Sequence, residues 1–343
     1  MPKVSDYPHV GKAIVDAIQR GAPDVDLNEL PNLQDMSPDK LTENVVAINS
    51  LDKNERRKYL LERLVQYMHT YVKETNLTTE EWMNAIQFLT KTGQTCTDLR
   101  QEFILLSDAF GVSALVDTIN HPKPKGATES TVLGPFFVED ARTVENGDAI
   151  ASEDKGEPML VKGRITDTSG KGIAHCLIET WETDEDGFYD TQYAEYEQDC
   201  RGRLYTDDDG YYAFRCVKPV AYPIPNDGPV GQLLRSMGRH VFRPSHLHMM
   251  FQAKGFVELI TSLYFKGDIF ITSDAVFGVK SSLITDPQQV KDKAQAQKYG
   301  FKSDEFWLLE RDFVLVTPEE NKKQKQINDD ELKKNLEKNH IKI

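Results

Sequence analysis

Arg243-Pro244-Ser245-His246-Leu247-His248 is the stretch of this 343-residue chain that decides its fold class. Pro244 fixes its own φ angle and disfavours the helical conformation of the residue before it. The run Met249-Met250-Phe251 that follows suits a pleated strand. Because side chains alternate between the two faces of a strand, His246 and His248 would lie side by side on one face. The stretch therefore predicts a β-strand that presents two imidazoles in the same direction.

A pair of imidazoles on one face is a candidate metal site, because histidine is the commonest side-chain metal ligand. An isolated His-x-His pair is a weak motif, and for such a pair two histidines packed on the face of a sandwich are the better explanation. Two tyrosines in loop-like surroundings, Tyr189 and Tyr222, extend the candidate set to two phenols and two imidazoles. A phenol titrates near pH 10, so it binds a metal at neutral pH only where a strongly Lewis-acidic cation replaces its proton. This set favours ferric iron over zinc, which prefers thiolate, imidazole and carboxylate ligands.

The composition describes an acidic globular protein. Lys and Arg number 41 against 55 Asp and Glu, giving a net charge of −14. That charge disfavours binding to nucleic acids and to anionic membranes. The four cysteines show no CxxC spacing, which argues against a zinc site or a disulfide framework. No apolar targeting segment or membrane-spanning run is apparent, and we expect a cytoplasmic protein.

The first part of the chain has a helical pattern. Residues 1–40 form a polar lead-in without sustained periodicity, and residues 41–125 are predicted to form a helical domain and linker. Leu60 to Val72 carries apolar residues at helical spacing. A capping box, Thr78-x-x-Glu81, opens the next predicted helix, which ends near Gly93. Two further helices are predicted, from about Thr97 through Leu99 to Gly111 and from Ser113 to Asn120; a Pro-rich stretch after them ends the helical region.

From residue 126 the apolar period changes from helical to alternating. The predicted strands are Met159–Ile165, Leu177–Trp181, Tyr211–Val217 and Ile269–Ile271, separated by turn-forming clusters. Residues 126–316 are therefore predicted to form an antiparallel β-sandwich. Residues 317–343 are predicted to be a charged tail, helical or disordered. The fold class is α+β, with an N-terminal helical segment followed by the sandwich.

The order of three motifs resembles that of the intradiol ring-cleaving dioxygenases. The motifs are Gly187-Phe188-Tyr189, then Tyr222-Pro223, then the G-R-H-x-x-R-P-x-H-x-H run of residues 238–248. The resemblance covers most of the chain, from the helical region through the strand expected after Asp274. It is greatest to the hydroxyquinol 1,2-dioxygenase branch, with catechol 1,2-dioxygenases next. It implies a homodimer formed by the helical segment, often with phospholipid between the subunits. It also implies one non-haem Fe(III) per subunit, held by the sandwich, and ring cleavage of an ortho-diphenol by O2.

The resemblance also implies roles for individual residues. Tyr189, Tyr222, His246 and His248 would be the iron ligands. The catalytic residues would be Arg243, beside the open coordination positions, and Tyr222, which would accept a substrate proton. The substrate would be bound by residues from the third helix, from a pocket-lining loop and from two later segments: Leu105, Asp108, Val132, Leu133, Gly134, Pro135, Phe136, Ile224, Pro225 and Val276.

The choice of substrate depends on two segments. Residues 272–280 resemble the hydroxyquinol branch more than the catechol branch, whereas catechol-cleaving relatives commonly have glutamine where this chain has Ser262 after Thr261. Hydroxyquinol is therefore the expected substrate and catechol the alternative. Two other classes stay open: a non-catalytic β-sandwich that binds an aromatic ligand, and a zinc hydrolase that uses the histidine pair with a third, acidic ligand.

Overall fold

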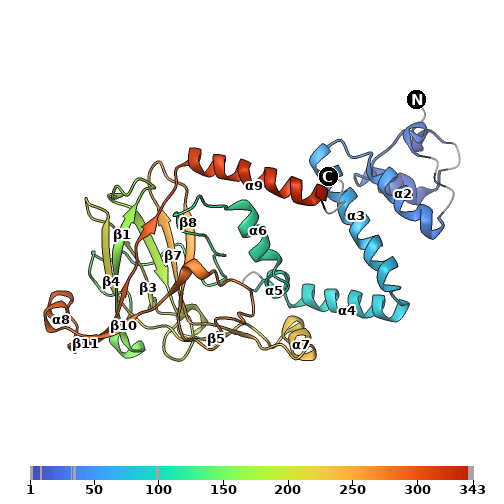
Figure 1. Ribbon diagram of the computed structural model, residues 1–343. Coiled ribbons are helices and arrows are strands. Elements are labelled where there is room, and N and C mark those ends of the chain that lie inside the picture. Colours follow the sequence, from blue (N-terminus) through green and yellow to red (C-terminus); the bar gives the residue numbers. More distant parts are fainter. Residues whose placement is uncertain (1–2, 8–9, 32, 34–35, 98–99, 339–343) are drawn as a thin grey trace. The chain divides into compact units, whose positions relative to one another are not determined.

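The computed structural model describes residues 3–7, 10–31, 33, 36–97 and 100–338 (Figure 1). Parts of the predicted lead-in, Leu99 of the third predicted helix and the last five residues of the predicted tail lie outside the described residues. The chain forms two compact units, Met1–Phe88 and Leu89–Ile343. The division falls within helix α4 (Thr79–Thr95).

The first unit is helical. It contains α1 (Lys12–Gln19), α2 (Pro38–Asn49), α3 (Glu55–Thr75) and the first part of α4. Helix α1 lies in the lead-in, for which we predicted no regular structure. Helix α3 carries the predicted apolar stripe, and that stripe faces outward. Its exposed large side chains are Leu60, Leu64, Met68 and Tyr71, each about half exposed.

The predicted capping box at the start of α4 is confirmed. The backbone N–H of Thr78 donates to Glu81 Oε2 at 2.9 Å, and the N–H of Glu81 donates to Thr78 Oγ1 at 3.2 Å. The helix ends at Thr95, close to the predicted end. The third and fourth predicted helices are α5 (Glu102–Ala109) and α6 (Val112–Asn120). Further helices of the second unit are α7 (Pro229–Ser236), α8 (Lys293–Tyr299) and α9 (Pro318–Lys338), the last within the predicted tail.

In the described part of the chain, two five-stranded sheets form a β-sandwich. The first sheet has the order β10-β11-β1-β12, with β4 paired to the other edge of β1, and the second has the order β3-β2-β7-β8-β9. Strands β5 and β6 form a separate pair. The strand bounds are β1 Pro158–Thr166, β2 Leu177–Trp181, β3 Arg201–Tyr205, β4 Tyr211–Val217, β5 Tyr222–Pro223, β6 Phe242–Arg243, β7 His246–Gln252, β8 Leu259–Phe265, β9 Ile284–Thr285, β10 Gln288–Lys291, β11 Glu305–Glu310 and β12 Phe313–Val314.

The prediction of a purely antiparallel sandwich is wrong, because both sheets are mixed. Strand β1 runs parallel to β11 and β12, and β8 runs parallel to β9. Parallel neighbours cannot be joined by a tight hairpin and need a long crossover connection. The connection from β8 to β9 is such a segment, and it contributes to the site described below.

The predicted strand Ile269–Ile271 is also wrong, because these residues form turns in that connection. Asp268 Oδ1 accepts a hydrogen bond from the N–H of Phe270 at 2.8 Å, and its Oδ2 accepts one from the N–H of Ser245 at 2.9 Å. A short acidic side chain that bonds nearby N–H groups competes with strand pairing. Ile269 is 81% exposed, so no sheet face buries the apolar run.

Strand β7 separates the core from the site. Leu247, Met249 and Phe251 point between the two sheets and join the main hydrophobic core. His246 and His248 therefore point to the outer face of the second sheet, as the alternation of a strand requires. Both are almost completely buried there, where Tyr189, Tyr222 and the segment around Gly134 pack against them.

Candidate metal centre and active site

The two imidazoles of β7 converge. The Nε2 atoms of His246 and His248 lie 3.1 Å apart. The Nδ1 atom of His246 is 2.8 Å from the carbonyl oxygen of Pro244, and that of His248 is 3.0 Å from Ser262 Oγ. A carbonyl only accepts hydrogen bonds, so Nδ1 of His246 carries the proton and its Nε2 presents a lone pair. This is the arrangement that a metal-binding imidazole requires.

The two tyrosines close the same space. Tyr189 is fully buried and follows Gly187, whose φ of +81° makes the sharp turn after β2 possible. Its Oη lies 3.4 Å from Nε2 of His246. The ring of Tyr222, on β5, packs edge-on against that of Tyr189 with centroids 5.4 Å apart. These two phenols and the two imidazoles are the side chains that can hold a metal ion.

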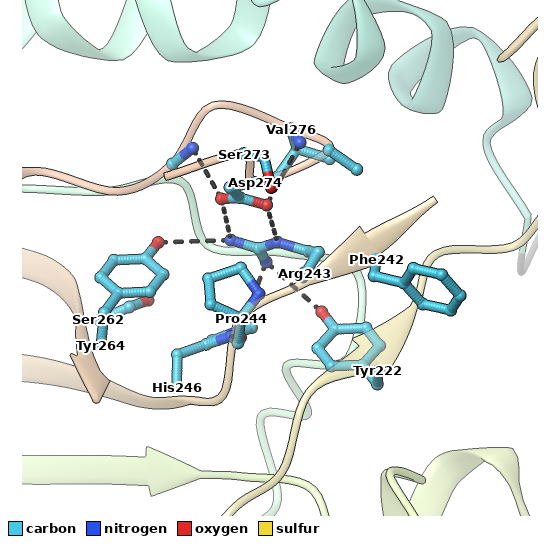
Figure 2. A network of polar contacts seen from close by, with 12 residues as sticks. Tyr222, Phe242, Arg243, Pro244, His246, Ser262, Tyr264, Ser273, Asp274 and Val276 are labelled. Carbon is cyan, nitrogen blue, oxygen red and sulfur yellow. Dashed lines mark hydrogen bonds and ion pairs between the residues drawn. The ribbon is translucent and has the colours of Figure 1, made fainter. Parts of the chain in front are cut away.

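Arg243 connects this group to the rest of the site. Its β6 position pairs with Tyr222 across the two-stranded sheet. Nη1 lies 3.4 Å from Tyr222 Oη and 3.3 Å from Nε2 of His246. On its other side the guanidinium forms a buried ion pair with Asp274 (Figure 2). A fixed positive charge therefore borders the candidate ligands.

Burial is the main cause of the pKa shifts of both histidines and of Tyr189. It lowers the pKa of both histidines well below the ordinary value, with a further contribution from the Arg243 charge at His246 and from His246 at His248. Burial and the neighbouring Tyr222 raise the pKa of Tyr189 well above its ordinary value. The imidazoles are thus neutral lone-pair donors, and the Tyr189 phenol gives up its proton only to a strongly Lewis-acidic cation.

Five of the predicted substrate contacts pack in two hydrophobic clusters. Leu105, Ile224 and Val276 pack in one hydrophobic cluster. Leu133 and Phe136 pack against the cluster that contains both tyrosines, and Phe136 stacks on Tyr189 with ring centroids 4.3 Å apart.

The other predicted contacts vary in their distance from the ligands. Gly134 lies against His248, since a Cβ there would be 3.4 Å from the imidazole. Val132 lines a neighbouring cavity of about 430 Å³ together with Leu133. Pro135 and Pro225 are exposed next to Gly134 and Ile224.

Asp108 lies on α5, half-buried near this cluster. Burial raises the pKa of its carboxyl group, whereas a hydrogen bond with Ser113 and the charge of Arg243 lower it. Its helix neighbours Leu105 and Ala109 belong to the same hydrophobic cluster as Ile224 and Val276.

Within the described residues, no group of three or more His, Cys, Asp or Glu side chains is arranged to hold a metal ion. A zinc hydrolase built on the histidine pair needs an acidic third ligand, so the described site does not support that alternative. In the same part of the chain, we find no helix with the length and apolar character needed to cross a membrane.

Comparison with known proteins identifies the family. A family model described as "Dioxygenase" matches residues 132–314, and one described as "Catechol dioxygenase N terminus" matches residues 54–128. The intradiol ring-cleavage dioxygenase hqdA of Aspergillus niger is 50% identical over 293 residues, covering 85% of this chain and 88% of the relative. The chain belongs to the intradiol ring-cleavage dioxygenases.

Other members of this dioxygenase family are similarly close. A hydroxyquinol 1,2-dioxygenase of a Rhizobium species is 50% identical over 280 residues, covering 81% of this chain and 95% of the relative. The solved structure of hydroxyquinol 1,2-dioxygenase from Pseudomonas putida DLL-E4 matches with a TM-score of 0.76 and 40% identity, covering 82% of this chain and 98% of that one. The predicted α+β class is confirmed, with the correction that the sheets are mixed.

Sequence analysis missed several residues of this dioxygenase site. Asp274 was noted only as part of a motif, and Ser262 only as a departure from catechol-cleaving relatives. Ser262 lies opposite His248 in the β7–β8 register. Trp181 lies opposite His248 on the β2 side and stacks on its imidazole, with centroids 4.8 Å apart. The spacing of residues does not reveal strand register, so only a predicted β2-β7-β8 order would have found these neighbours.

Proposed function

We propose that this dioxygenase cleaves the ring of hydroxyquinol (1,2,4-trihydroxybenzene) between its two adjacent hydroxylated carbons. Both atoms of O2 enter the product, a hydroxymuconate that can tautomerise to maleylacetate. The observation that carries the proposal is the convergence of two phenols and two imidazoles beside the buried Arg243. The relatives named hydroxyquinol 1,2-dioxygenases, at up to 50% identity, support the choice of substrate.

We infer that the site holds one non-haem Fe(III) per subunit through Tyr189, Tyr222, His246 and His248. Two buried Nε2 atoms 3.1 Å apart, with the proton of His246 held at Nδ1, are a donor pair suited to a shared cation. Two phenols beside them suit a trivalent, strongly Lewis-acidic ion rather than zinc. When bound, the iron would supply the Lewis acidity that favours the deprotonated ortho-diol.

The residues of the chain would share the remaining work. Leu105, Ile224 and Val276 would cover the substrate ring and exclude water. The Oη of Tyr222 would accept one proton from a substrate hydroxyl group. The positive charge of Arg243 would stabilise the negative charge that develops on the ring and on oxygen during cleavage, a type of interaction that contributes about 2.7–4 kcal/mol per donor.

Asp108 is the residue we assign to the choice of hydroxyquinol. It is half-buried on α5, the helix that supplies Leu105 and Ala109 to the cluster containing Val276. A carboxylate there would accept a hydrogen bond from the third hydroxyl group of hydroxyquinol, which catechol lacks. A site built to hydrogen-bond a hydroxyl discriminates against an analogue without it.

The test uses purified holoenzyme with hydroxyquinol and, separately, with catechol. We expect one O2 consumed per molecule of hydroxyquinol and, with ¹⁸O-labelled O2, two labelled atoms in the product by mass spectrometry. A higher kcat/KM for catechol than for hydroxyquinol would show that catechol, the alternative, is the preferred substrate. Binding without O2 consumption would instead support a non-catalytic binding module.

We also propose that the helical first unit mediates a homodimer, with phospholipid bound between the subunits, and that the enzyme works in the cytoplasm. The outward apolar stripe of α3, with Leu64 and Tyr71 more than half exposed, supports an interface there. Sedimentation equilibrium of the wild type and of Leu64→Glu would test the dimer, and mass spectrometry of a solvent extract would test for the lipid. A monomeric wild type would refute this part of the proposal.

A further inference from the structure

Asp274 makes a two-point contact with Arg243. Asp274 Oδ1 accepts from Nε at 3.1 Å, and its Oδ2 accepts from Nη2 at 3.3 Å. The side chains of both residues are at least 96% buried. Figure 2 shows the guanidinium between the carboxylate of Asp274 on one side and Tyr222 and His246 on the other. A charge pair of this geometry restricts the rotation of the guanidinium as well as neutralising it.

The carboxylate is itself held by the backbone of its own loop. The N–H of Val276 donates to Oδ1 at 3.3 Å, and the N–H of Gly278 donates to Oδ2 at 2.9 Å. Asp274 therefore cannot turn away from Arg243 without losing these backbone bonds. The loop lies in the β8–β9 connection, so a single turn carries both this anchor and the predicted substrate contact Val276.

Nη1 is the guanidinium nitrogen of Arg243 that donates no hydrogen bond to Asp274. Nη1 points to Tyr222 Oη and to Nε2 of His246, and Nη2 also donates to Tyr264 Oη at 3.3 Å. A guanidinium that is anchored through Nε and Nη2 presents Nη1 in one direction only. We propose that Asp274 is a positioning residue of the ring-cleavage reaction, which aims Nη1 of Arg243 at the oxygen atoms that react beside Tyr222. The inference rests on the proposed function.

A purely structural role predicts a different result from a positioning role. If Asp274 only balanced a buried charge, its loss would lower stability and leave kcat per iron unchanged. If it positions Arg243, its loss lowers kcat in a protein that still holds iron and substrate. Its effect should also disappear when the guanidinium is already absent, because coupled residues are not additive.

The experiment compares Asp274→Asn, Arg243→Gln and the double variant in the iron-loaded enzyme. We expect Asp274→Asn to lower kcat for hydroxyquinol about 30- to 100-fold, the range for a misplaced catalytic group or a lost outer ligand contact. Iron per subunit, the visible absorption of the resting enzyme and the Kd for hydroxyquinol without O2 should stay within about threefold. In the Arg243→Gln background, Asp274→Asn should change kcat less than about threefold.

Glu179→Gln is the matched control, because Glu179 is also buried and also pairs with an arginine. Its partner, Arg203, lies opposite it on the neighbouring strand β3. We expect it to keep the wild-type kcat. Unchanged kcat in Asp274→Asn, loss of its iron, or full additivity in the double variant would each overturn the positioning role. Failure of the wild type to cleave hydroxyquinol would instead overturn the proposed function.

Gly278→Ala tests the same inference without changing a charge. A Cβ at Gly278 would lie 2.7 Å from Tyr264 Oη and 2.9 Å from Nη2 of Arg243. These distances force the guanidinium to shift, so we expect kcat to fall about tenfold or more with iron retained. Gly93→Ala is the control, because the nearest atom, in Phe103, would be at an ordinary 3.5 Å. Wild-type kcat in Gly278→Ala would count against the proposal.

Discussion

The two histidines of the candidate site differ in what holds them. Nδ1 of His246 donates to a backbone carbonyl, which leaves one choice of tautomer. Nδ1 of His248 meets the hydroxyl of Ser262, which in turn lies 3.1 Å from the hydroxyl of Thr131. A hydroxyl can donate or accept, so His248 depends on this pair of hydroxyls for its orientation. Ser262, at the position where catechol-cleaving relatives commonly have glutamine, therefore supports a candidate ligand.

Substitution of Tyr189 by phenylalanine should remove the iron. The ring would still stack on Phe136, but the buried phenol oxygen beside His246 would be lost. Loss of a residue that hydrogen-bonds to a metal ligand typically lowers the affinity for the metal 10- to 100-fold. We expect loss of a direct ligand to lower it at least as much. Elemental analysis and the visible spectrum, in which phenolate-to-iron charge transfer appears, provide the measurement. The control is Tyr205→Phe, at a tyrosine that is 48% exposed; this variant should keep both iron and colour. Full iron content in the Tyr189 variant would show that Tyr189 is not an iron ligand.

Asp108→Asn should change the choice of substrate. A hydrogen bond to a charged group is worth about 1.5–3 kcal/mol, so kcat/KM for hydroxyquinol should fall about 10- to 100-fold. Catechol lacks the third hydroxyl, and its kcat/KM should change less than about threefold. Steady-state O2 consumption with both substrates gives the ratio. Equal losses on the two substrates would show that Asp108 does not recognise that hydroxyl.

At the scale of elements, the ends of β2 and β4 are linked by a buried carboxyl group. Glu182 follows β2 in the second sheet, and its Oε1 accepts a hydrogen bond from the N–H of Val217, in β4 of the first sheet, at 3.0 Å. Its Oε2 is buried without a hydrogen-bond partner in the described structure. Burial raises the pKa of Glu182 well above its ordinary value, despite the bonds to Val217 and Cys216 that lower it. Burial therefore favours the protonated form of this carboxyl group in the folded protein.

This raised pKa predicts a stability that falls as pH rises. Between the unfolded pKa of Glu, about 4.3, and the higher folded value, the folded state binds more protons than the unfolded state, so its free energy of unfolding decreases with pH. Glu182→Gln keeps the shape of the side chain but removes the titratable group. At pH 8 its Tm should exceed that of the wild type by about 2–4 °C for each kcal/mol of unfolding free energy that the wild type loses through this titration. The two proteins should converge near pH 4.

Thermal unfolding from pH 4 to pH 9 measures the difference. Glu185→Gln, three residues along and exposed, is the control and should follow the wild type throughout. A constant difference between Glu182→Gln and the wild type at all pH values would contradict the assigned titration.

At the scale of the whole molecule, the candidate metal centre and the main core are separate. The core lies between the two sheets and includes Leu247, Met249 and Phe251. The candidate ligands Tyr189 and Tyr222 belong to a smaller cluster on the outer face of the second sheet. The two share strand β7 but bury different faces of it. We therefore expect the sandwich to fold without a bound metal.

Removal of iron should accordingly leave a folded protein. We expect the apoenzyme to keep the far-UV circular dichroism of the holoenzyme and to lose its visible absorption and activity. Its Tm should be lower, because a ligand that binds only the folded state stabilises it by RT ln(1 + [L]/Kd), about 4 kcal/mol at a thousandfold excess over Kd. Addition of iron and O2 should restore colour, activity and Tm. An unfolded apoenzyme would show that the metal is part of the folding core.

The sequence by itself determined the features that depend on local pattern. Alternation along residues 246–251 predicted which side chains share a face, and the structure confirms it. The Thr78–Glu81 capping box predicted the start of α4 for the same reason, since its bonds span three residues. The motif order also identified the dioxygenase family and the four candidate ligands, which the structure brings together.

Only the tertiary structure decided how distant segments meet. The parallel pairing of β1 with β11, the position of Ser262 opposite His248 and the contact of Asp274 with Arg243 each join segments whose local patterns contain no register. The apolar residues Ile269–Ile271 looked like a strand but turn instead, because Asp268 bonds their backbone and that of Ser245. Local periodicity reports which faces must be buried. Which segments pair with one another is determined by packing and hydrogen bonds between parts of the chain that lie far apart in the sequence.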